Sequence, residues 1–154
     1  MLRISFALMI LVFARFASAS HFEICLSQVK ATEHRLIRLE SIQACFDNNK
    51  HSISADICFA SAKKVQLREH SIELSENLNA ICFYDVSQFK DINSCLKKAE
   101  LFQISNTHDE AVFECYRQFQ ASLTLKQCLQ VSDALKYPAK KEYLRNHCNS
   151  AAGN

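Results

Sequence analysis

Residues 91–128 read DINSCLKKAELFQISNTHDEAVFECYRQFQASLTLKQC, and this segment holds one copy of a pattern that recurs along the chain. Within it 20 residues separate Cys95 from Cys115, and 13 residues separate Cys115 from Cys128. The chain has eight cysteines, spaced by 20, 13, 24, 13, 20, 13 and 20 residues: Cys25, Cys45, Cys58, Cys82, Cys95, Cys115, Cys128 and Cys148. A recurring period is typical of a duplicated structural unit. We therefore predict four units, over about 25–45, 58–82, 95–115 and 128–148.

The residues around these cysteines favour helices. Four positions before the first cysteine of a unit stand Ser54, Asp91 and Thr124, and all three residue types are preferred at helix N-caps. Only one Gly and one Pro occur among the 154 residues, so few positions oppose helix formation. These features predict an all-α fold, a disulfide-stapled array of four repeated helical units resembling a four-helix bundle.

The N-terminal residues 1–19 have the pattern of a secretory signal peptide. Arg3 supplies a positive charge, residues 4–13 are almost all apolar, and Ala17-Ser18-Ala19 matches a small-residue cleavage site. We expect cleavage after Ala19, with cleavage after Ser20 as the alternative. The mature chain, residues 20–154, is then expected to be a single disulfide-rich helical domain that is secreted and extracellular.

The charge balance argues against a polyanionic partner. The chain carries 18 basic and 16 acidic residues, and two of the basic ones, Arg3 and Arg15, belong to the expected signal peptide. The mature chain is therefore formally neutral and has no run of Lys and Arg that would neutralise several phosphates. We expect no nucleic-acid partner, and no second apolar segment is long enough to span a membrane.

An even number of cysteines behind a secretion signal favours disulfides over thiols or metal ligands. The sequence has no Cys-x-x-Cys pair and no cysteine–histidine cluster at zinc-finger spacing. No two histidines lie four residues apart. All eight cysteines are therefore predicted to form disulfides, and no metal site or cofactor is expected.

Helical periodicity suggests which cysteines pair. Apolar residues continue through the first unit at helical spacing (Val29, Leu36, Leu39), and Leu67, Leu74 and Leu78 do so in the second. A single helix of 20 residues would place its end cysteines roughly 30 Å apart, whereas a disulfide needs Cα atoms within about 7 Å. Antiparallel neighbours in a bundle instead predict four bridges between units: Cys45–Cys58, Cys82–Cys95, Cys115–Cys128 and Cys25–Cys148.

The alternative is four helical hairpins, each stapled at its base by a bridge within one unit. Two units show breaks that favour it. Thr107 to Glu110 resembles a capping box after Ser105-Asn106, and Tyr137-Pro138 interrupts the fourth unit. The apparently unbroken first half opposes it, so both pairings stay open at this point.

No catalytic motif stands out, and we expect no enzyme. Asp109-Glu110 invites an acid–base interpretation, but acids at a solvated helix N-terminus are the more common reason for such a pair. The lysine pairs at 63–64, 97–98 and 140–141 suggest a basic ridge, although nearby glutamates favour ordinary solvated helix faces.

The sequence therefore predicts a secreted, non-enzymatic interaction protein, a venom-type, toxin-like or salivary component that acts on an extracellular protein target. This function requires an exposed apolar or charged patch. One alternative is a body-fluid carrier, whose small apolar ligand would sit in an enclosed cavity lined by phenylalanines. The other is a host-defence protein, antimicrobial or metal-sequestering, which the neutral charge disfavours.

Overall fold

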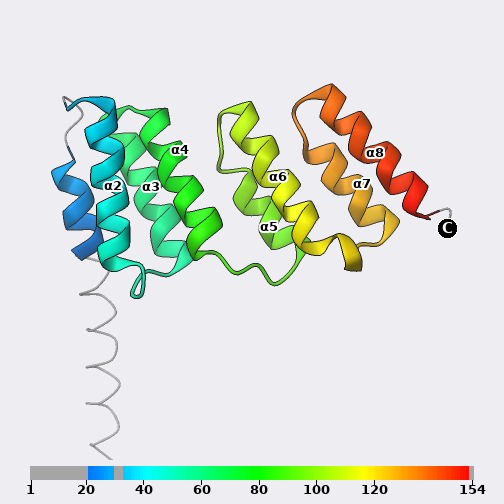
Figure 1. Ribbon diagram of the computed structural model, residues 1–154, viewed down its shortest axis with the longest axis horizontal. Helices are drawn as coiled ribbons and strands as arrows, with labels where there is room; N and C mark the ends of the chain where they lie inside the picture. The colour runs from blue at the N-terminus through cyan, green and yellow to red at the C-terminus, as the bar shows by residue number, and fades with distance from the viewer. Residues whose placement is uncertain (1–20, 30–32, 153–154) are drawn as a thin grey trace, which may run out of the picture. The chain divides into compact units, whose positions relative to one another are not determined.

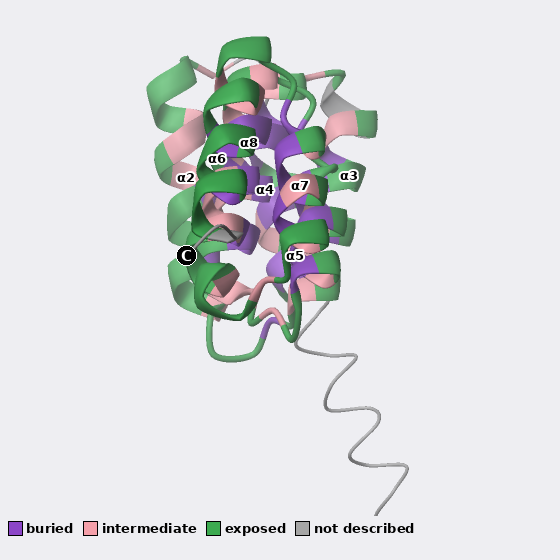
Figure 2. Cartoon of the chain, turned by 90° about the vertical axis from the view of Figure 1, so that its right-hand side faces the viewer, coloured by how far each residue is buried: buried purple, intermediate pink, exposed green. Residues whose placement is uncertain are grey.

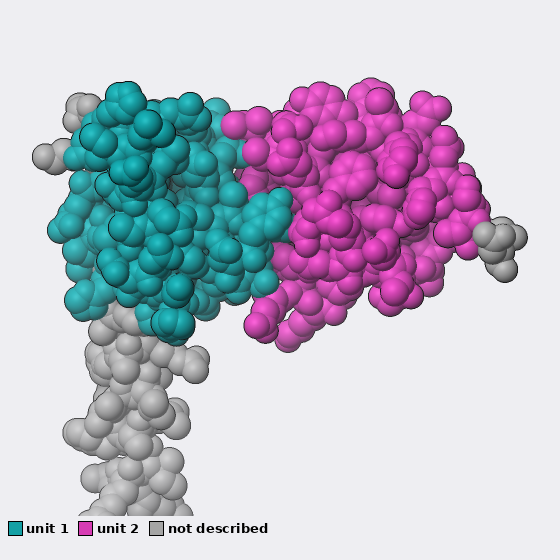
Figure 3. All heavy atoms as spheres, viewed as in Figure 1, with its two compact units in different colours: residues 1–87 teal, residues 88–154 magenta. Residues whose placement is uncertain are grey.

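A computed structural model describes residues 21–29 and 33–152, and no β-strand occurs among them. The chain divides into two compact units, residues 1–87 and residues 88–154 (Figure 3), and each is treated by itself below. The predicted signal peptide, residues 1–19, lies outside the described residues.

The first unit contains two helical hairpins (Figure 1). Residues 21–28 are helical and precede α2 (Arg35–Asn49). The second hairpin joins α3 (Ala55–Glu69) to α4 (Ile72–Ile81), which continues directly into a π-helical turn, η1 (Cys82–Val86).

The second unit also contains two hairpins. Its first pairs α5 (Ile92–Ala99) with α6 (Ser105–Phe119), which ends in a 3-10 turn, η2 (Gln120–Ser122). Its second pairs α7 (Leu125–Ala134) with α8 (Pro138–Ala152), and α7 also packs against α6. The predicted all-α, disulfide-stapled array of four repeated units is confirmed, and its units are hairpins.

Each hairpin is closed by one disulfide at its base, the end where the chain enters and leaves. The bridges are Cys25–Cys45, Cys58–Cys82, Cys95–Cys115 and Cys128–Cys148, with Cα–Cα separations of 5.6 to 5.7 Å. The pairing derived from long helices, Cys45–Cys58, Cys82–Cys95, Cys115–Cys128 and Cys25–Cys148, is therefore wrong. That pairing assumed one long helix between the two cysteines of each repeat, and the assumption fails because the chain reverses direction inside every repeat.

The reversals missed in the first half have local causes. In the first hairpin His34 caps α2, since its Nδ1 accepts the backbone N–H of Leu36. In the second hairpin His70 adopts a left-handed conformation (φ 48°) that ends α3. Ser71 then caps α4 by accepting the N–H of Leu74. The apolar periodicity at Leu67 and Leu74 thus runs across a turn, and Leu67 is exposed.

The second helix of each hairpin keeps the same register to its cysteine. It begins ten residues before that cysteine and ends four residues after it, counting η1 as the continuation of α4. The four segments are Arg35–Asn49, Ile72–Val86, Ser105–Phe119 and Pro138–Ala152. The second hairpin has four more residues between its cysteines than the other three, and these extra residues lie before Ile72. Its first helix, α3, is 15 residues long, whereas the corresponding helix of the third hairpin, α5, has 8.

The predicted N-caps are confirmed. The side chains of Ser54, Asp91 and Thr124 each accept a backbone N–H from three residues later, and Asp91 and Thr124 form capping boxes with Ser94 and Gln127. The predicted capping box at Thr107 is wrong. The helix begins at Ser105, and the Thr107 hydroxyl donates to the carbonyl of Ile104.

The core gathers along one side of each helix, as the buried residues in Figure 2 show. Seven of the eight cysteines are buried, and four of them are followed by a buried apolar residue: Phe46, Phe59, Phe83 and Leu96. The buried aromatic side chains are Phe22, Phe46, Phe59, Phe83 and Phe102. Burying a side chain of this size contributes about 2 kcal/mol, so each hairpin couples apolar packing to a covalent bridge.

Candidate functional site

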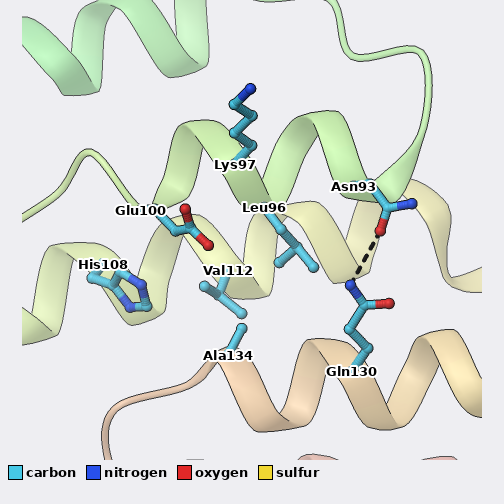
Figure 4. A pocket seen from close by; sticks show the side chains of 8 residues that line it. All are labelled: Asn93, Leu96, Lys97, Glu100, His108, Val112, Gln130 and Ala134. Atoms are coloured by element: carbon cyan, nitrogen blue, oxygen red, sulfur yellow. Dashed lines mark hydrogen bonds between the residues drawn. The ribbon is translucent and has the colours of Figure 1, made fainter.

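A groove of about 480 Å³ lies in the second unit between α5, α6 and α7. The side chains around it mix apolar, amide and charged groups (Figure 4). They are Asn93, Leu96, Lys97, Glu100, His108, Val112, Gln130 and Ala134. The short α5 and its tight cap at Asp91 hold Asn93, Leu96, Lys97 and Glu100 over α6.

An amide pair joins two of the helices that line the groove. The Nε2 group of Gln130 on α7 donates to Oδ1 of Asn93 on α5 at 3.2 Å (Figure 4). Both side chains belong to exposed residues. The pair marks one side of the groove, and Leu96, Val112 and Ala134 supply apolar surface beside it.

His108 lines the groove from α6 and is buried, with 5% of its surface exposed. Its Nδ1 lies 3.2 Å from Oδ1 of Asp109. Asp109 is fully buried and accepts two backbone N–H groups from the turn before α8, those of Lys136 (2.7 Å) and Tyr137 (3.1 Å). The carboxylate therefore links the imidazole to the neighbouring hairpin.

The surroundings of Asp109 keep its carboxyl ionised. Burial alone raises the pKa of Asp109, but the backbone N–H groups of Lys136 and Tyr137 lower it. The hydrogen bond from His108 and the positive charge of Lys140 act in the same direction, and the net result is a pKa of Asp109 below its usual value of 3.8. A carboxylate only accepts hydrogen bonds, so the Nδ1 of His108 carries a proton.

This arrangement corrects the prediction for Asp109-Glu110. Asp109 was expected at a solvated helix N-terminus, but it is fully buried and capped by a distant turn, whereas Glu110 is exposed. Sequence reasoning missed Glu100 and His108 as groove residues. The only signal was the adjacency of an imidazole and a carboxylate in one helix.

Two further grooves are smaller or more open. One, of about 280 Å³ in the first unit, is lined by Glu23, Leu26, Ser61, Lys64 and Val65, and an ion pair of 2.6 Å joins Lys64 to Glu23 across it. The other, of about 590 Å³, is a shallow surface along α7. It is lined by Leu125, Lys126, Leu129, Gln130 and Asp133.

The lysine pairs occupy several kinds of surface. Lys63 and Lys97 are exposed, and Lys64 pairs with Glu23. Lys140 contacts the Tyr137 ring, 5.1 Å from its centroid, and donates to Oδ1 of Asn106. Lys64 and Lys140 therefore contact Glu23, Asn106 and Tyr137 rather than the glutamates near them in sequence.

Exposed apolar side chains gather at the tips of the hairpins, the ends where the chain reverses. Every hairpin has at least one within about a turn of its reversal: Leu36, Ile37, Leu67, Ile72, Leu101, Ile104 and Tyr137. The remaining four large exposed apolar residues lie elsewhere: Ile24, Tyr84, Leu125 and Tyr143. Each tip therefore exposes one or two large apolar side chains.

The carrier alternative predicts a cavity lined by phenylalanines. None of the three grooves described above is lined by Phe, and five of the phenylalanines fill the core instead. Within residues 21–29 and 33–152, no group of three or more His, Cys, Asp or Glu is placed to hold a metal ion. In the same residues no helix is long and apolar enough to cross a membrane.

No model of a known family, no curated protein and no solved structure matches the chain.

Proposed function

We propose that this chain is a secreted, non-enzymatic binding protein of the toxin-like or salivary kind, and that its hairpin tips contact an extracellular protein target. The observation that carries the proposal is the division of each hairpin into a stapled base and an apolar tip. The bridge fixes the two helices at one end, and large apolar side chains are exposed at the other.

Physical reasons connect these features to binding. A disulfide reduces the freedom of the unfolded chain and persists in oxidising compartments, so a stapled hairpin suits extracellular conditions. Exposed apolar side chains cost solubility, but they supply most of the binding energy when a partner covers them. A tip held in a fixed conformation also loses little entropy on binding.

The binding experiment compares two variants of the oxidised protein. The tip variant carries Leu101→Ser with Ile104→Ser, and the control carries Leu125→Ser with Ile24→Ser, the same two substitutions at exposed positions away from any tip. Binding to purified receptor and channel ectodomains is measured by surface plasmon resonance. We expect saturable binding to a target, weakened at least tenfold in the tip variant and little changed in the control.

Two results would contradict the proposal: tip and control variants that bind equally well, or no saturable binding to any ectodomain. Secretion is tested separately by expressing the full chain in a eukaryotic cell and sequencing the N-terminus of the exported protein. We expect the mature chain to begin at Ser20, and retention inside the cell would contradict the extracellular part of the proposal.

A further inference from the structure

We propose that the groove between α5, α6 and α7 binds a small organic molecule that carries a protonated amine on an apolar body. Glu100 and His108 of this groove adjoin the tip residues Leu101 and Ile104, but the proposal does not rest on the proposed function, and its test measures binding of a small amine rather than of a protein target. Three features of the groove favour such a ligand: the hydrogen-bonding state of His108, the charge of Glu100 and the apolar wall.

His108 presents a hydrogen-bond acceptor to the groove. Its Nδ1 donates to the Asp109 carboxylate, which Lys136 and Tyr137 hold in place through their backbone N–H groups. In the neutral ring the lone pair then sits on Nε2. Among the described residues none hydrogen-bonds this Nε2, and the atom is open to the groove rather than sealed in the core. A ligand with an N–H donor can therefore reach it there.

The charges around the groove favour a cation. The titratable groups that line it are Glu100, Lys97 and His108, and the Asp109 carboxylate lies directly behind the imidazole. In Figure 4 the Lys97 side chain extends away from the apolar residues, whereas Glu100 turns toward them. An ammonium group between these two residues would donate a charge-assisted hydrogen bond to the Glu100 carboxylate. It would donate a second hydrogen bond to Nε2 of His108.

The rest of the groove fits a short apolar body. Leu96, Val112 and Ala134 line it with aliphatic carbon, and the Asn93–Gln130 pair stands at one side. Its volume of about 480 Å³ lies within the range of small-molecule sites in proteins. A ring or short chain would pack on these three residues while the amine reaches the two acceptors.

The experiment uses the oxidised, full-length mature protein and three probes that share a phenylalkyl body. These are 2-phenylethylamine, the uncharged 2-phenylethanol and the anionic 3-phenylpropionate. Binding is measured at neutral pH by calorimetry and by the NMR shifts of the His108 ring protons. We expect the amine to bind one site per chain, and the other two probes to bind at least tenfold more weakly.

Variants locate the site. Glu100→Gln, at an exposed position, should weaken amine binding about tenfold, and His108→Gln should weaken it by a similar factor. Glu142→Gln removes an exposed acid of the same unit outside the groove and should leave affinity unchanged. Because His108 is buried, we check by circular dichroism that the His108→Gln protein is folded. If it is unfolded, the affinity of Glu100→Gln alone decides the test.

Three outcomes would overturn the proposal. They are equal binding of all three probes, no detectable binding of the amine at millimolar concentrations, or wild-type affinity in Glu100→Gln.

Discussion

Among single residues, Asp109 shows how one position of a repeat takes its character from its neighbours. It stands six residues before the second cysteine of its hairpin, and Glu142 holds the equivalent position in the last one. Asp109 is fully buried under the turn of the following hairpin, whereas Glu142 is exposed. The carboxylate of Asp109 therefore joins two hairpins, and the Lys136 ammonium adds bonds to the carbonyls of Phe102 and Gln103.

Replacing this carboxylate should destabilise the second unit. Asp109→Asn keeps one acceptor oxygen but loses the charge that strengthens two backbone hydrogen bonds and orients His108. We expect the free energy of unfolding to fall by about 2 kcal/mol, measured by urea denaturation. Glu142→Gln is the matched control and should change it by less than about 0.5 kcal/mol. Equal effects would show that the buried bonds contribute nothing.

The same carboxylate predicts an acid dependence of stability. The folded pKa of Asp109 lies below its usual value of 3.8. The ionised form therefore stabilises the fold above about pH 4, and this contribution is lost as the pH falls through the lowered pKa. We expect the stability difference between wild type and Asp109→Asn to be constant near neutral pH and to shrink below about pH 4. Glu114, whose pKa the Arg117 guanidinium lowers, is unchanged in both proteins, so its own titration cancels from this difference.

A stability difference that stays constant down to about pH 2 would contradict the assignment. Denaturant titrations at a series of pH values, in a buffer of fixed ionic strength, supply the measurement. Fixed ionic strength matters because salt screens the exposed ion pairs more than the buried carboxylate.

Among the helices, the caps fix where each hairpin begins. Thr124 accepts the N–H of Gln127, and the Gln127 side chain receives both the N–H and the hydroxyl of Thr124. These bonds satisfy groups that a helix start leaves unpaired. They place Cys128 on the fourth residue of α7, where it faces Cys148 on α8.

Removing this cap should cost stability without changing the fold. Thr124→Ala removes the two bonds of the Thr124 hydroxyl and leaves the backbone N–H of residue 124 bonded to Oε1 of Gln127. We expect a loss of about 1 kcal/mol in the free energy of unfolding. Ser122→Ala, which removes only an exposed hydroxyl bonded to the carbonyl of Phe119, is the control and should have a smaller effect. The measurement is thermal unfolding followed by circular dichroism. A loss in Thr124→Ala no larger than the control's would count against the cap.

These helices also show what the sequence could and could not predict. Ser54, Asp91 and Thr124 were identified as caps because their signal is local, and the fourth-unit break at Tyr137-Pro138 was visible because Pro cannot continue a helix. The reversal at His70 carries neither Gly nor Pro. Its left-handed φ of 48° is uncommon for a residue other than Gly or Asn, so the local sequence gave no signal of the reversal.

The candidate groove was predictable only in part. The acids at 109 and 110 drew attention as a pair, but burial separates them, and burial depends on a turn 27 residues away. Glu100 and His108 both line the groove because α5 ends at Ala99 and α6 begins at Ser105, so that the chain reverses between the two residues. The length of a helix and the closure of a hairpin depend on tertiary packing. The local sequence around Glu100 and His108 therefore gave no sign that these residues line a groove.

At the level of the whole molecule, every covalent cross-link stays within one hairpin. A disulfide that closes a loop of about 20 residues raises the free energy of unfolding by about 3 kcal/mol, because it restricts the conformations of the unfolded chain. Replacing both Cys95 and Cys115 with Ala should therefore lower the free energy of unfolding by about that amount. The loss is measured by urea denaturation of the variant with the other three bridges intact. A loss below about 1 kcal/mol would mean that packing alone holds this hairpin closed.

The pattern of bridges also fixes how the chain behaves when it is cut. No disulfide crosses the boundary between Ser87 and Gln88, because Cys58–Cys82 lies before it and Cys95–Cys115 after it. A specific protease site inserted there should yield two separate fragments on electrophoresis without reductant. A bundle with Cys82–Cys95 and Cys25–Cys148 would instead keep the fragments joined until reduction. The same cut in fully reduced protein is the control, since it releases two fragments under either pairing and so verifies complete cleavage.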